Sequence, residues 1–213
     1  MKIIIYTALC GSVENKRNEL NDKQVKDDRL QYIAYVDIPA IYNSNTWEIR
    51  EMQRPFVNPV RNAKIFKIMP HLFFDCDYSI WIDSTYSLRE FPERLLHYVK
   101  DKDMAVWKHE GRDCIYEESK AIIGFGYEKV STINEQVEYY HSKGHPAHAG
   151  LANCSILVRK HTKEMERLNE EWWAHICRFS QRDQMSFPVV FKDRYTEIEE
   201  NKDQFFIKEP YRL

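Results

Sequence analysis

The sequence lacks the features that mark several large classes of protein. No stretch approaches the roughly 20 consecutive apolar residues of a membrane-spanning helix, and the apolar start MKIIIYTALCG is too short for a cleaved signal peptide. The net charge of the 213 residues is only −2, so there is no bulk positive charge for nucleic acid or an anionic membrane. We therefore expect a protein without a membrane span and without a nucleic-acid partner.

Several ligand-binding motifs are also missing. The chain has neither the GxGxxG motif of dinucleotide-binding domains nor the GxxxxGK[ST] motif of P-loop proteins. The five cysteines are odd in number and widely spaced, and none forms a CxxC pair, which argues against a structural zinc site. Free thiols of this kind are typical of a reducing environment, so we expect a cytoplasmic protein.

The composition is typical of a folded globular protein. Hydrophobic residues make up 43% and charged residues 30%, which argues against disorder. The aromatic content of 14% is high, and aromatic side chains both build cores and stack on sugars. Because repeats and low-complexity linkers are missing, we expect one domain at residues 1–195, followed by a charged, peripheral tail at 196–213.

Apolar, strand-like runs alternate with helix-like segments along the chain. We predict strands at residues 2–6, 30–36, 78–82, 104–108 and 151–158. We predict helices at residues 59–69, 91–100, 115–122, 131–143, 161–179 and 182–191. This alternation is typical of an α/β fold, in which helices flank a mostly parallel sheet.

Polar residues follow the first three predicted strands, namely Thr7, Asp37 and Asp83. The carboxyl ends of parallel strands share one edge of a sheet, and α/β proteins bind nucleotides outside that edge. Asp83 is therefore placed to face a ligand or a metal, with the capping of a loop as the alternative. For Asp37 the alternative is capping of the turn before Pro39.

Two basic residues lie on the helix before Asp83. Lys64 and Lys67 are three positions apart and so share one helix face. Together with the strand-end carboxylate they indicate an anionic ligand, such as a metal-bridged phosphate.

A literal D-x-D at Asp75 and Asp77 would suit a hard cation. It precedes the strand, at the opposite edge from Asp83, so we interpret it as a turn.

Three later segments also carry candidate chemistry. In HEGRDCIYEE, Arg112 can bind phosphate or carboxylate with two hydrogen bonds and Glu117 is a candidate acid, with a solvated helix start as the alternative. The loop GHPAHAG carries His145 and His148, whose spacing permits a metal site without requiring one. Asp183 is either a general base or an acid near a helix start.

Four sequence blocks occur in an order that points to a known family. They are AKIFKIMPHLFFDCDYSIWIDSTY, HEGRDCIYEES, QVEYYHSKGHPAHAGLANCSILVRKHT and WWAHICRFSQRDQMSFP, between about Tyr6 and Phe191. The chain resembles a glycosyltransferase-related family of unknown-function proteins from bacteria, phage and plants. Its plant members are described as hexosyltransferase-like, and some as ceramidase-like. More distantly, the chain resembles GT-A glycosyltransferases that use nucleotide sugars, which implies a GT-A-like (Rossmann-like) single domain.

The resemblance implies roles for particular residues. In GT-A enzymes, a strand ending in D-x-D binds a divalent metal, Mn²⁺ or Mg²⁺, together with the donor diphosphate. A later glycine-containing strand segment and a D-Q pair line the donor or acceptor sugar. Those places match Asp83, Gly150 and the pair Asp183 and Gln184 in this sequence.

One departure from the GT-A pattern concerns the metal. The D-x-D place reads DST, so the second carboxylate is missing after Asp83. Metal binding there would be weak, completed by water or histidine, or absent. In the last case, Arg61, Lys64 and Lys67 would neutralise the diphosphate instead.

We therefore expect a glycosyltransferase that moves a sugar from a nucleotide-sugar donor to a saccharide or other hydroxyl acceptor, for instance in surface polysaccharide synthesis. The expected donor-binding residues are Thr7, Gly11, Asp37, Arg61, Lys64, Lys67, Asp83 and Arg112. The expected catalytic residues are Asp183 and Glu117, those at the acceptor or sugar are His148, Gly150 and Gln184, and the metal ligand is Asp83. Two alternatives are a metal-dependent amide hydrolase (ceramidase-like), which needs several ligands around an activated water, and a noncatalytic nucleotide- or sugar-binding protein.

Overall fold

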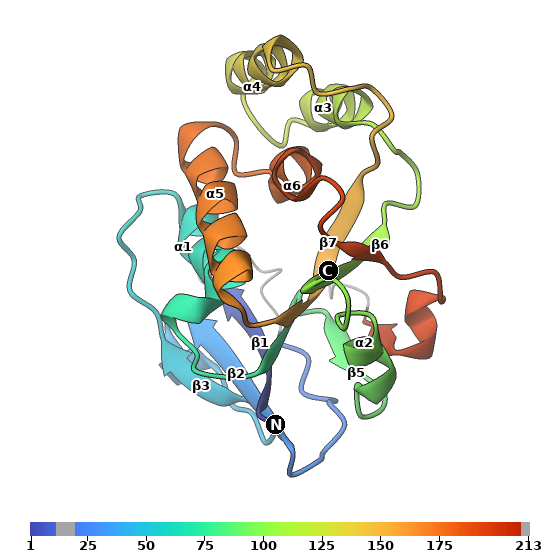
Figure 1. Ribbon diagram of the computed structural model, residues 1–213. Coiled ribbons are helices and arrows are strands. Elements are labelled where there is room, and N and C mark those ends of the chain that lie inside the picture. Colours follow the sequence, from blue (N-terminus) through green and yellow to red (C-terminus); the bar gives the residue numbers. More distant parts are fainter. Residues whose placement is uncertain (12–19, 210–213) are drawn as a thin grey trace.

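A seven-stranded sheet in the order β3-β2-β1-β4-β7-β6-β8 forms the centre of the protein, as the computed structural model of residues 1–11 and 20–209 shows (Figure 1). Its strands are β1 (Ile3–Leu9), β2 (Leu30–Val36), β3 (Glu48–Glu51), β4 (Tyr78–Ile82), β6 (Met104–Lys108), β7 (Ala152–Lys160) and β8 (Thr196–Glu197). A second, two-stranded sheet pairs β5 (Tyr86–Leu88) with β9 (Phe206–Lys208). The predicted α/β fold with a mostly parallel sheet is confirmed.

The strand directions bring several chain segments to one edge of the sheet. Strands β1, β2, β3 and β4 run parallel to one another, whereas β7 is antiparallel to both β4 and β6. The carboxyl ends of β1, β2, β4 and β6 therefore lie at the same edge as the amino end of β7. We call this edge the carboxyl edge. It is where an α/β sheet is expected to bind a ligand.

In the part of the chain that the structure describes, six α-helices surround the sheet and extend beyond it. They are α1 (Pro59–Ile68), α2 (Glu93–His97), α3 (Ile115–Gly124), α4 (Val130–Ser142), α5 (Lys163–Arg178) and α6 (Asp183–Phe191), with 3-10 turns at Pro39–Ile41, Pro70–Leu72 and Lys202–Gln204. Helices α1, α5 and α6 pack on one sheet face and α2 on the other, while α3 and α4 stand beyond the sheet next to α6 (Figure 1). No helix among the described residues has both the length and the apolar character to cross a bilayer.

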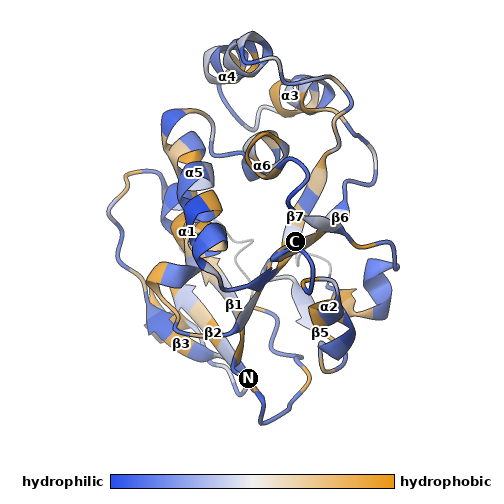
Figure 2. Ribbon diagram, viewed as in Figure 1, coloured by the Kyte–Doolittle hydropathy of each residue, from blue (hydrophilic) through white to orange (hydrophobic). Residues whose placement is uncertain are grey.

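The strands form because their residues suit a sheet that is covered on both faces. In β1, Ile4 and Tyr6 point into the core beneath α1 and α5, and Ile3 and Ile5 point into the core on the α2 side. A strand that is buried on both faces is expected to be apolar throughout, as β1 is apart from Thr7. The helices instead carry both hydrophilic and hydrophobic residues, which Figure 2 shows clearly for α5, because only one side of each helix packs on the core.

The segment from Thr196 onward is part of the core, so its prediction as a peripheral charged tail was wrong. Strand β8 pairs with β6 at one border of the main sheet, and β9 pairs with β5. Ile198, Phe205 and Phe206 are almost completely buried, and the indole of Trp107 donates a 2.7 Å hydrogen bond to the carbonyl of Glu200. Three apolar side chains therefore anchor a segment whose many charges suggested a solvated tail.

We expect Phe206→Ala to lower the free energy of unfolding by about 3 kcal/mol, because it leaves a cavity among buried aromatic side chains. Urea denaturation followed by tryptophan fluorescence would measure the change. The neighbouring Ile207 is 45% exposed, so Ile207→Ala is a matched control that should change stability by less than about 0.5 kcal/mol. Equal effects of the two substitutions would show that the segment does not contribute to the core.

Candidate functional site

Asp83 lies directly after β4 at the carboxyl edge. Its backbone N–H donates to the carbonyl of Ser155 on β7 at 2.9 Å, which fixes the position of the residue against the sheet. Its carboxylate accepts a 2.9 Å hydrogen bond from the indole of Trp81 and lies 3.7 Å from the ammonium of Lys67. The side chain is 43% exposed, so the carboxylate is held in place and still open to a ligand.

Helix α1 presents Lys64 and Lys67 toward this carboxylate. The helix begins after Asn58, whose side chain accepts hydrogen bonds from two backbone N–H groups of the first turn, and Pro59 occupies the first helical position. This start fixes which face of α1 points to the sheet. Lys64 and Lys67 lie on that face, and both side chains are largely buried.

Asp183, the first residue of α6, lies between the two lysines. One oxygen of its carboxylate is 2.5 Å from the Lys64 ammonium and 2.6 Å from that of Lys67. Burial alone would raise the pKa of Asp183, but the two ammonium groups outweigh burial and hold the pKa well below its usual range. The structure thus brings together four of the predicted residues, Lys64, Lys67, Asp83 and Asp183, which we call the lysine–aspartate cluster.

The two lysines respond differently to this environment. Burial lowers the pKa of Lys64 despite its contact with Asp183. Burial also acts to lower the pKa of Lys67, but the carboxylates of Asp183 and Asp83 outweigh it and raise that pKa. Lys67 therefore stays charged at neutral pH. Because Asp183 has so low a pKa, it is a weak proton acceptor, which argues against its predicted role as general base. Its contacts favour a role in holding the two lysines in place.

Unpaired polar atoms border the cluster at the start of α6. The Arg61 guanidinium donates a 3.1 Å hydrogen bond to the carbonyl of Phe179, but its buried Nε has no partner among the described residues. The same is true of the Gln181 Oε1 and Arg182 Nε atoms in the segment that leads into α6. Buried polar groups normally have partners, so these atoms mark a place that a polar ligand or water would occupy.

Gly150 and Gln184 lie farther along the carboxyl edge. The Gln184 side chain donates to the carbonyl of Ala152 at 3.3 Å, and the Gly150 N–H donates to the carbonyl of Asp113 at 2.9 Å. Gly150 has a positive φ of 92°, and a Cβ there would lie 3.4 Å from the Tyr195 hydroxyl. Glycine is therefore needed for the turn that joins the GHPAHAG loop to β7.

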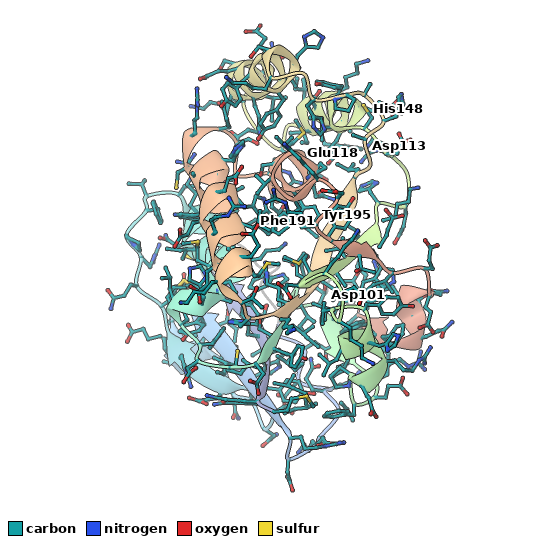
Figure 3. The ribbon with its side chains drawn as sticks, viewed as in Figure 1. Asp101, Asp113, Glu118, His148, Phe191 and Tyr195 are labelled. Atoms are coloured by element: carbon teal, nitrogen blue, oxygen red, sulfur yellow. The ribbon has the colours of Figure 1, made fainter. Side chains whose placement is uncertain are left out.

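A second polar group lies where this loop meets α3, and Figure 3 shows two of its members, Asp113 and His148, side by side. His148 Nδ1 is 2.7 Å from a carboxylate oxygen of Asp113, and one ligand atom each from Asp113, Glu117 and His148 lie within 4.8 Å of one another. The hydrogen bond and the negative charge of Asp113 raise the pKa of His148. Tyr116 ties the loop to α3 by donating a 2.6 Å hydrogen bond to the carbonyl of His145.

The ligand sets of the two groups differ in how well they fit a divalent cation. Two carboxylates and an imidazole at Asp113, Glu117 and His148 are a donor set that suits such ions. Asp83 belongs to no comparable set of three within the described part of the chain, and the Lys67 ammonium already lies beside it. Thr85, at the second D-x-D place, is buried. Asp113, Glu117 and His148, which we call the Asp113 group, therefore fit a divalent cation better than Asp83 does.

Three further predicted donor-binding residues, Thr7, Gly11 and Asp37, lie in or just after strands β1 and β2. Thr7 is fully buried inside β1, because the strand continues to Leu9. The buried carboxylate of Asp37 accepts a 2.7 Å hydrogen bond from the Gly11 N–H and lies 3.9 Å from the Arg54 guanidinium, so it links the segments that follow β1 and β2. Residues 12–19, which follow Gly11, lie outside the described residues. The complete burial of Thr7 and the contacts of Asp37 thus favour structural roles, although the buried Thr7 hydroxyl has no hydrogen-bond partner among the described residues.

Arg112 is also engaged within the protein. Its Nε donates a 2.6 Å hydrogen bond to the carboxylate of Glu118, whose side chain is only 4% exposed. A buried carboxylate needs such a partner, which favours a structural role for Arg112, and its contact with phosphate stays a prediction. The literal D-x-D lies at the opposite edge, where Asp77 accepts a 2.7 Å hydrogen bond from the Lys2 N–H. This agrees with its interpretation as a turn.

Sequence reasoning missed Trp81 and Asp113 as members of the two groups. Trp81 precedes Asp83 by two positions, and side chains two apart in a strand point to the same face, so this spacing was the available signal. Asp113 stood within a segment already recognised as polar. Its partner His148 is 35 positions away in the sequence, and nothing local pairs the two.

Comparison with known proteins finds related plant sequences. Over 148 residues, 64% of this chain and 26% of the other, the chain is 26% identical to "Probable hexosyltransferase MUCI70" of Arabidopsis thaliana. Over 187 residues, 80% of this chain and 40% of the other, it is 26% identical to "Alkaline ceramidase TOD1" of the same plant. The chain thus spans less than half the length of both relatives.

Solved glycosyltransferases share the fold and match the chain over nearly all its length. The apo form of GlyE from Streptococcus pneumoniae TIGR4 superposes with a TM-score of 0.50 at 13% identity, covering 93% of this chain and 45% of GlyE. The apo structure of the bifunctional enzyme WbbM superposes with a TM-score of 0.50 at 15% identity, covering 93% of this chain and 38% of WbbM. These likenesses identify a GT-A-like fold. Because the sequence profile of the family described as "TOD1/MUCI70, glycosyltransferase-like domain" matches residues 33–212, the chain belongs to that family.

Proposed function

We propose that this domain transfers a sugar, a hexose by analogy with its hexosyltransferase-like relative, from a nucleotide-sugar donor to a hydroxyl of a saccharide acceptor. The observation that supports this most directly is Asp83, an open carboxylate at the carboxyl edge of a GT-A-like sheet, held beside two buried lysines. In such a fold this edge is where the nucleotide is expected.

The lysine–aspartate cluster suits the stabilisation of charge on a departing diphosphate. The two ammonium groups are fixed by Asp183 before any ligand arrives, so no reorganisation is needed when negative charge develops. Arg61, one turn before Lys64 on α1, would supply a further donor through its unpaired Nε. Asp83 would orient the donor and limit the net positive charge near Lys67.

A divalent cation, Mn²⁺ or Mg²⁺, would be held by Asp113, Glu117 and His148, whose donor atoms fit it. When bound it would supply positive charge at the carboxyl edge. The protein holds the three ligands together by two hydrogen bonds. Tyr116 donates to the carbonyl of His145, before His148 in the loop, and the Gly150 N–H, after it, donates to the carbonyl of Asp113. Glu117, predicted as a catalytic acid, is more simply a ligand in this arrangement.

The test of the proposed transfer is turnover of nucleotide sugars by the purified protein. UDP- and GDP-linked hexoses would be supplied with neutral saccharides, and release of the nucleoside diphosphate and formation of a glycoside would be followed with Mn²⁺ and with EDTA. We expect at least one donor to be consumed, slowly without an acceptor and faster with one. The proposal fails if no donor in the panel binds or reacts.

We expect His148→Ala to weaken Mn²⁺ binding at least roughly tenfold, since loss of groups that only support a metal ligand already costs that much. Electron paramagnetic resonance of free Mn²⁺ would measure the affinity. His141→Ala is the matched control, because His141 is an exposed histidine of α4 outside the group. Equal Mn²⁺ affinity in both variants would remove the Asp113 group as the metal site.

Amide hydrolysis is a second candidate, favoured by the same ligand group. Two carboxylates and one imidazole leave coordination positions for a water that attacks an amide, and one relative is described as an alkaline ceramidase. A short-chain ceramide incubated with the Mn²⁺- or Zn²⁺-loaded protein tests this. Release of fatty acid that EDTA abolishes, without any nucleotide-sugar turnover, would favour hydrolysis over transfer.

A further inference from the structure

A cavity of about 660 Å³ lies on the other side of α6 from the lysine–aspartate cluster. It is bounded by α4, α5, α6 and the loop that joins α4 to β7. Its lining residues are Tyr139, Tyr140, Lys143, Gly144, His145, Pro146, Ala149, Glu171, His175, Pro188, Val189, Lys192 and Asp193. The volume falls within the usual range for sites that bind small molecules, and apart from the His145 carbonyl, which accepts the Tyr116 hydrogen bond, no role described above uses these residues.

Aromatic rings form part of the wall of this cavity. The rings of Tyr140 and His175 stack with centroids 5.5 Å apart, and the Tyr140 hydroxyl is 2.8 Å from His175 Nδ1. The side chain of Gln136 donates a 3.0 Å hydrogen bond to the same hydroxyl, which holds Tyr140 in place. Tyr139 and Pro188 add further flat or apolar surface. Tyr140 itself is fully buried, so the partly exposed rings of Tyr139 and His175 supply the aromatic surface of the cavity.

The polar groups of the cavity are suited to an uncharged ligand. His145 Nε2 is buried and has no hydrogen-bond partner among the described residues, so a ligand hydroxyl would satisfy it. The charged residues are Lys143, Lys192, Glu171 and Asp193, two of each sign. Because these charges balance, the cavity has no net attraction for an anion such as a phosphate or for a cation.

We propose that this cavity binds a neutral saccharide, as the subsite for sugar units of the acceptor that lie away from the reacting hydroxyl. Saccharides combine hydroxyl groups with apolar C–H faces, and ring walls with isolated polar atoms match both. A charged cofactor or a lipid tail matches this lining less well, because the charges cancel and polar groups interrupt the apolar surface. The assignment of the saccharide as acceptor rests on the proposed transferase function.

The position of the cavity connects it to the carboxyl edge. Helix α6 contributes Asp183 to the lysine–aspartate cluster and Pro188 and Val189 to the cavity, so the two places are separated by about the width of one helix, ~10 Å. Ala149 lines the cavity, and the next residue, Gly150, lies at the carboxyl edge. An acceptor of several sugar units can therefore reach both places at once.

The test fills the cavity from an exposed position. Ala149→Trp places an indole in the cavity, while Ala147→Trp adds the same ring to the same loop at an exposed residue that does not line it. The probes are β-1,4-linked oligomers of glucose, xylose, mannose and galactose with two to six units, titrated by calorimetry. We expect the wild-type protein to bind at least one series, Ala149→Trp to weaken that binding at least tenfold, and Ala147→Trp to leave it unchanged.

A second variant, Tyr139→Ala, removes a ring from the opposite wall and should weaken binding of the same oligomer. Circular dichroism would establish that each variant is folded. The inference is overturned if the wild-type protein binds none of the oligomers, or if both tryptophan variants bind as the wild type does.

Donor turnover, measured in parallel with and without acceptor, separates the transferase proposal from the cavity proposal. Absence of donor turnover in the wild type both with and without acceptor contradicts the transferase, whereas donor turnover with unchanged oligomer binding in Ala149→Trp contradicts only the cavity.

Discussion

Replacing Asp83 with alanine should lower the rate of sugar transfer by about 100-fold or more while the protein stays folded. The reason lies in the position of the side chain. Its carboxylate is held by the Trp81 indole and the Lys67 ammonium, yet it is 43% exposed and faces the carboxyl edge. Loss of a half-exposed side chain leaves no large cavity, so stability should change little. Rates of nucleoside diphosphate release with saturating donor would measure the effect.

Two further variants make the test of Asp83 specific. Asp83→Asn keeps the size and one hydrogen-bond acceptor of the side chain but removes its charge, so a similar loss of rate would assign the effect to charge. Asp101→Ala removes an exposed carboxylate that precedes β6 and so lies at the opposite edge of the sheet (Figure 3). It should retain wild-type activity. Full activity of Asp83→Ala would exclude Asp83 from the site.

Local sequence patterns predicted the bounds of several central strands correctly. Strands β2, β4 and β6 begin and end at the predicted residues, because their apolar, β-branched and aromatic runs are short and clearly bounded. The identification of Asp83 followed directly, since a strand that ends at Ile82 places the next side chain at the edge of the sheet. These conclusions needed only the periodicity and the ends of single segments.

The errors arose where distant parts of the chain decide the structure. The end predicted for β1 was three residues too early, because parallel pairing with β2 extends the strand through Thr7 to Leu9, which buries Thr7. The segment from Thr196 was predicted to be peripheral because its charges are visible in the sequence, whereas its pairing with β5 and β6 is not. The ion pair between Asp183 and Lys64 is likewise not visible in the sequence, because the two residues are 119 positions apart.

Asp183→Leu should lower the free energy of unfolding by about 3 to 5 kcal/mol, which is the usual cost of removing one partner from a buried ion pair. The Asp183 side chain is 7% exposed and that of Lys67 only 4%, so the substitution leaves at least one ammonium group buried without a carboxylate. Urea denaturation at pH 7 would measure the loss. Asp193→Leu, at an exposed carboxylate just after α6, is the control and should change stability by less than about 0.5 kcal/mol.

The stability difference between the wild type and Asp183→Leu should depend on pH, because the pKa of Asp183 is shifted in the folded protein. The pKa of Asp183 is lowered in the folded protein, so its contribution to stability is complete above the ordinary aspartate pKa of about 4 and is lost as the pH falls toward the folded value. The stability difference between the wild type and Asp183→Leu should therefore be constant from pH 5 to 8 and should shrink below about pH 4. A difference that stayed the same at pH 3 would show that lost packing, rather than lost charge, causes the destabilisation.

Removing all three charges together should restore much of the stability. In Lys64→Met, Lys67→Met, Asp183→Leu the buried charges are replaced by apolar side chains of similar size, which in other proteins is often neutral or stabilising. We expect this triple variant to unfold within about 1 kcal/mol of the wild type, yet to lose transfer activity. That combination would mean that the cluster is kept for its charge at the donor site rather than for stability. A triple variant as unstable as Asp183→Leu would instead show that the ion pairs themselves hold α1 against α6.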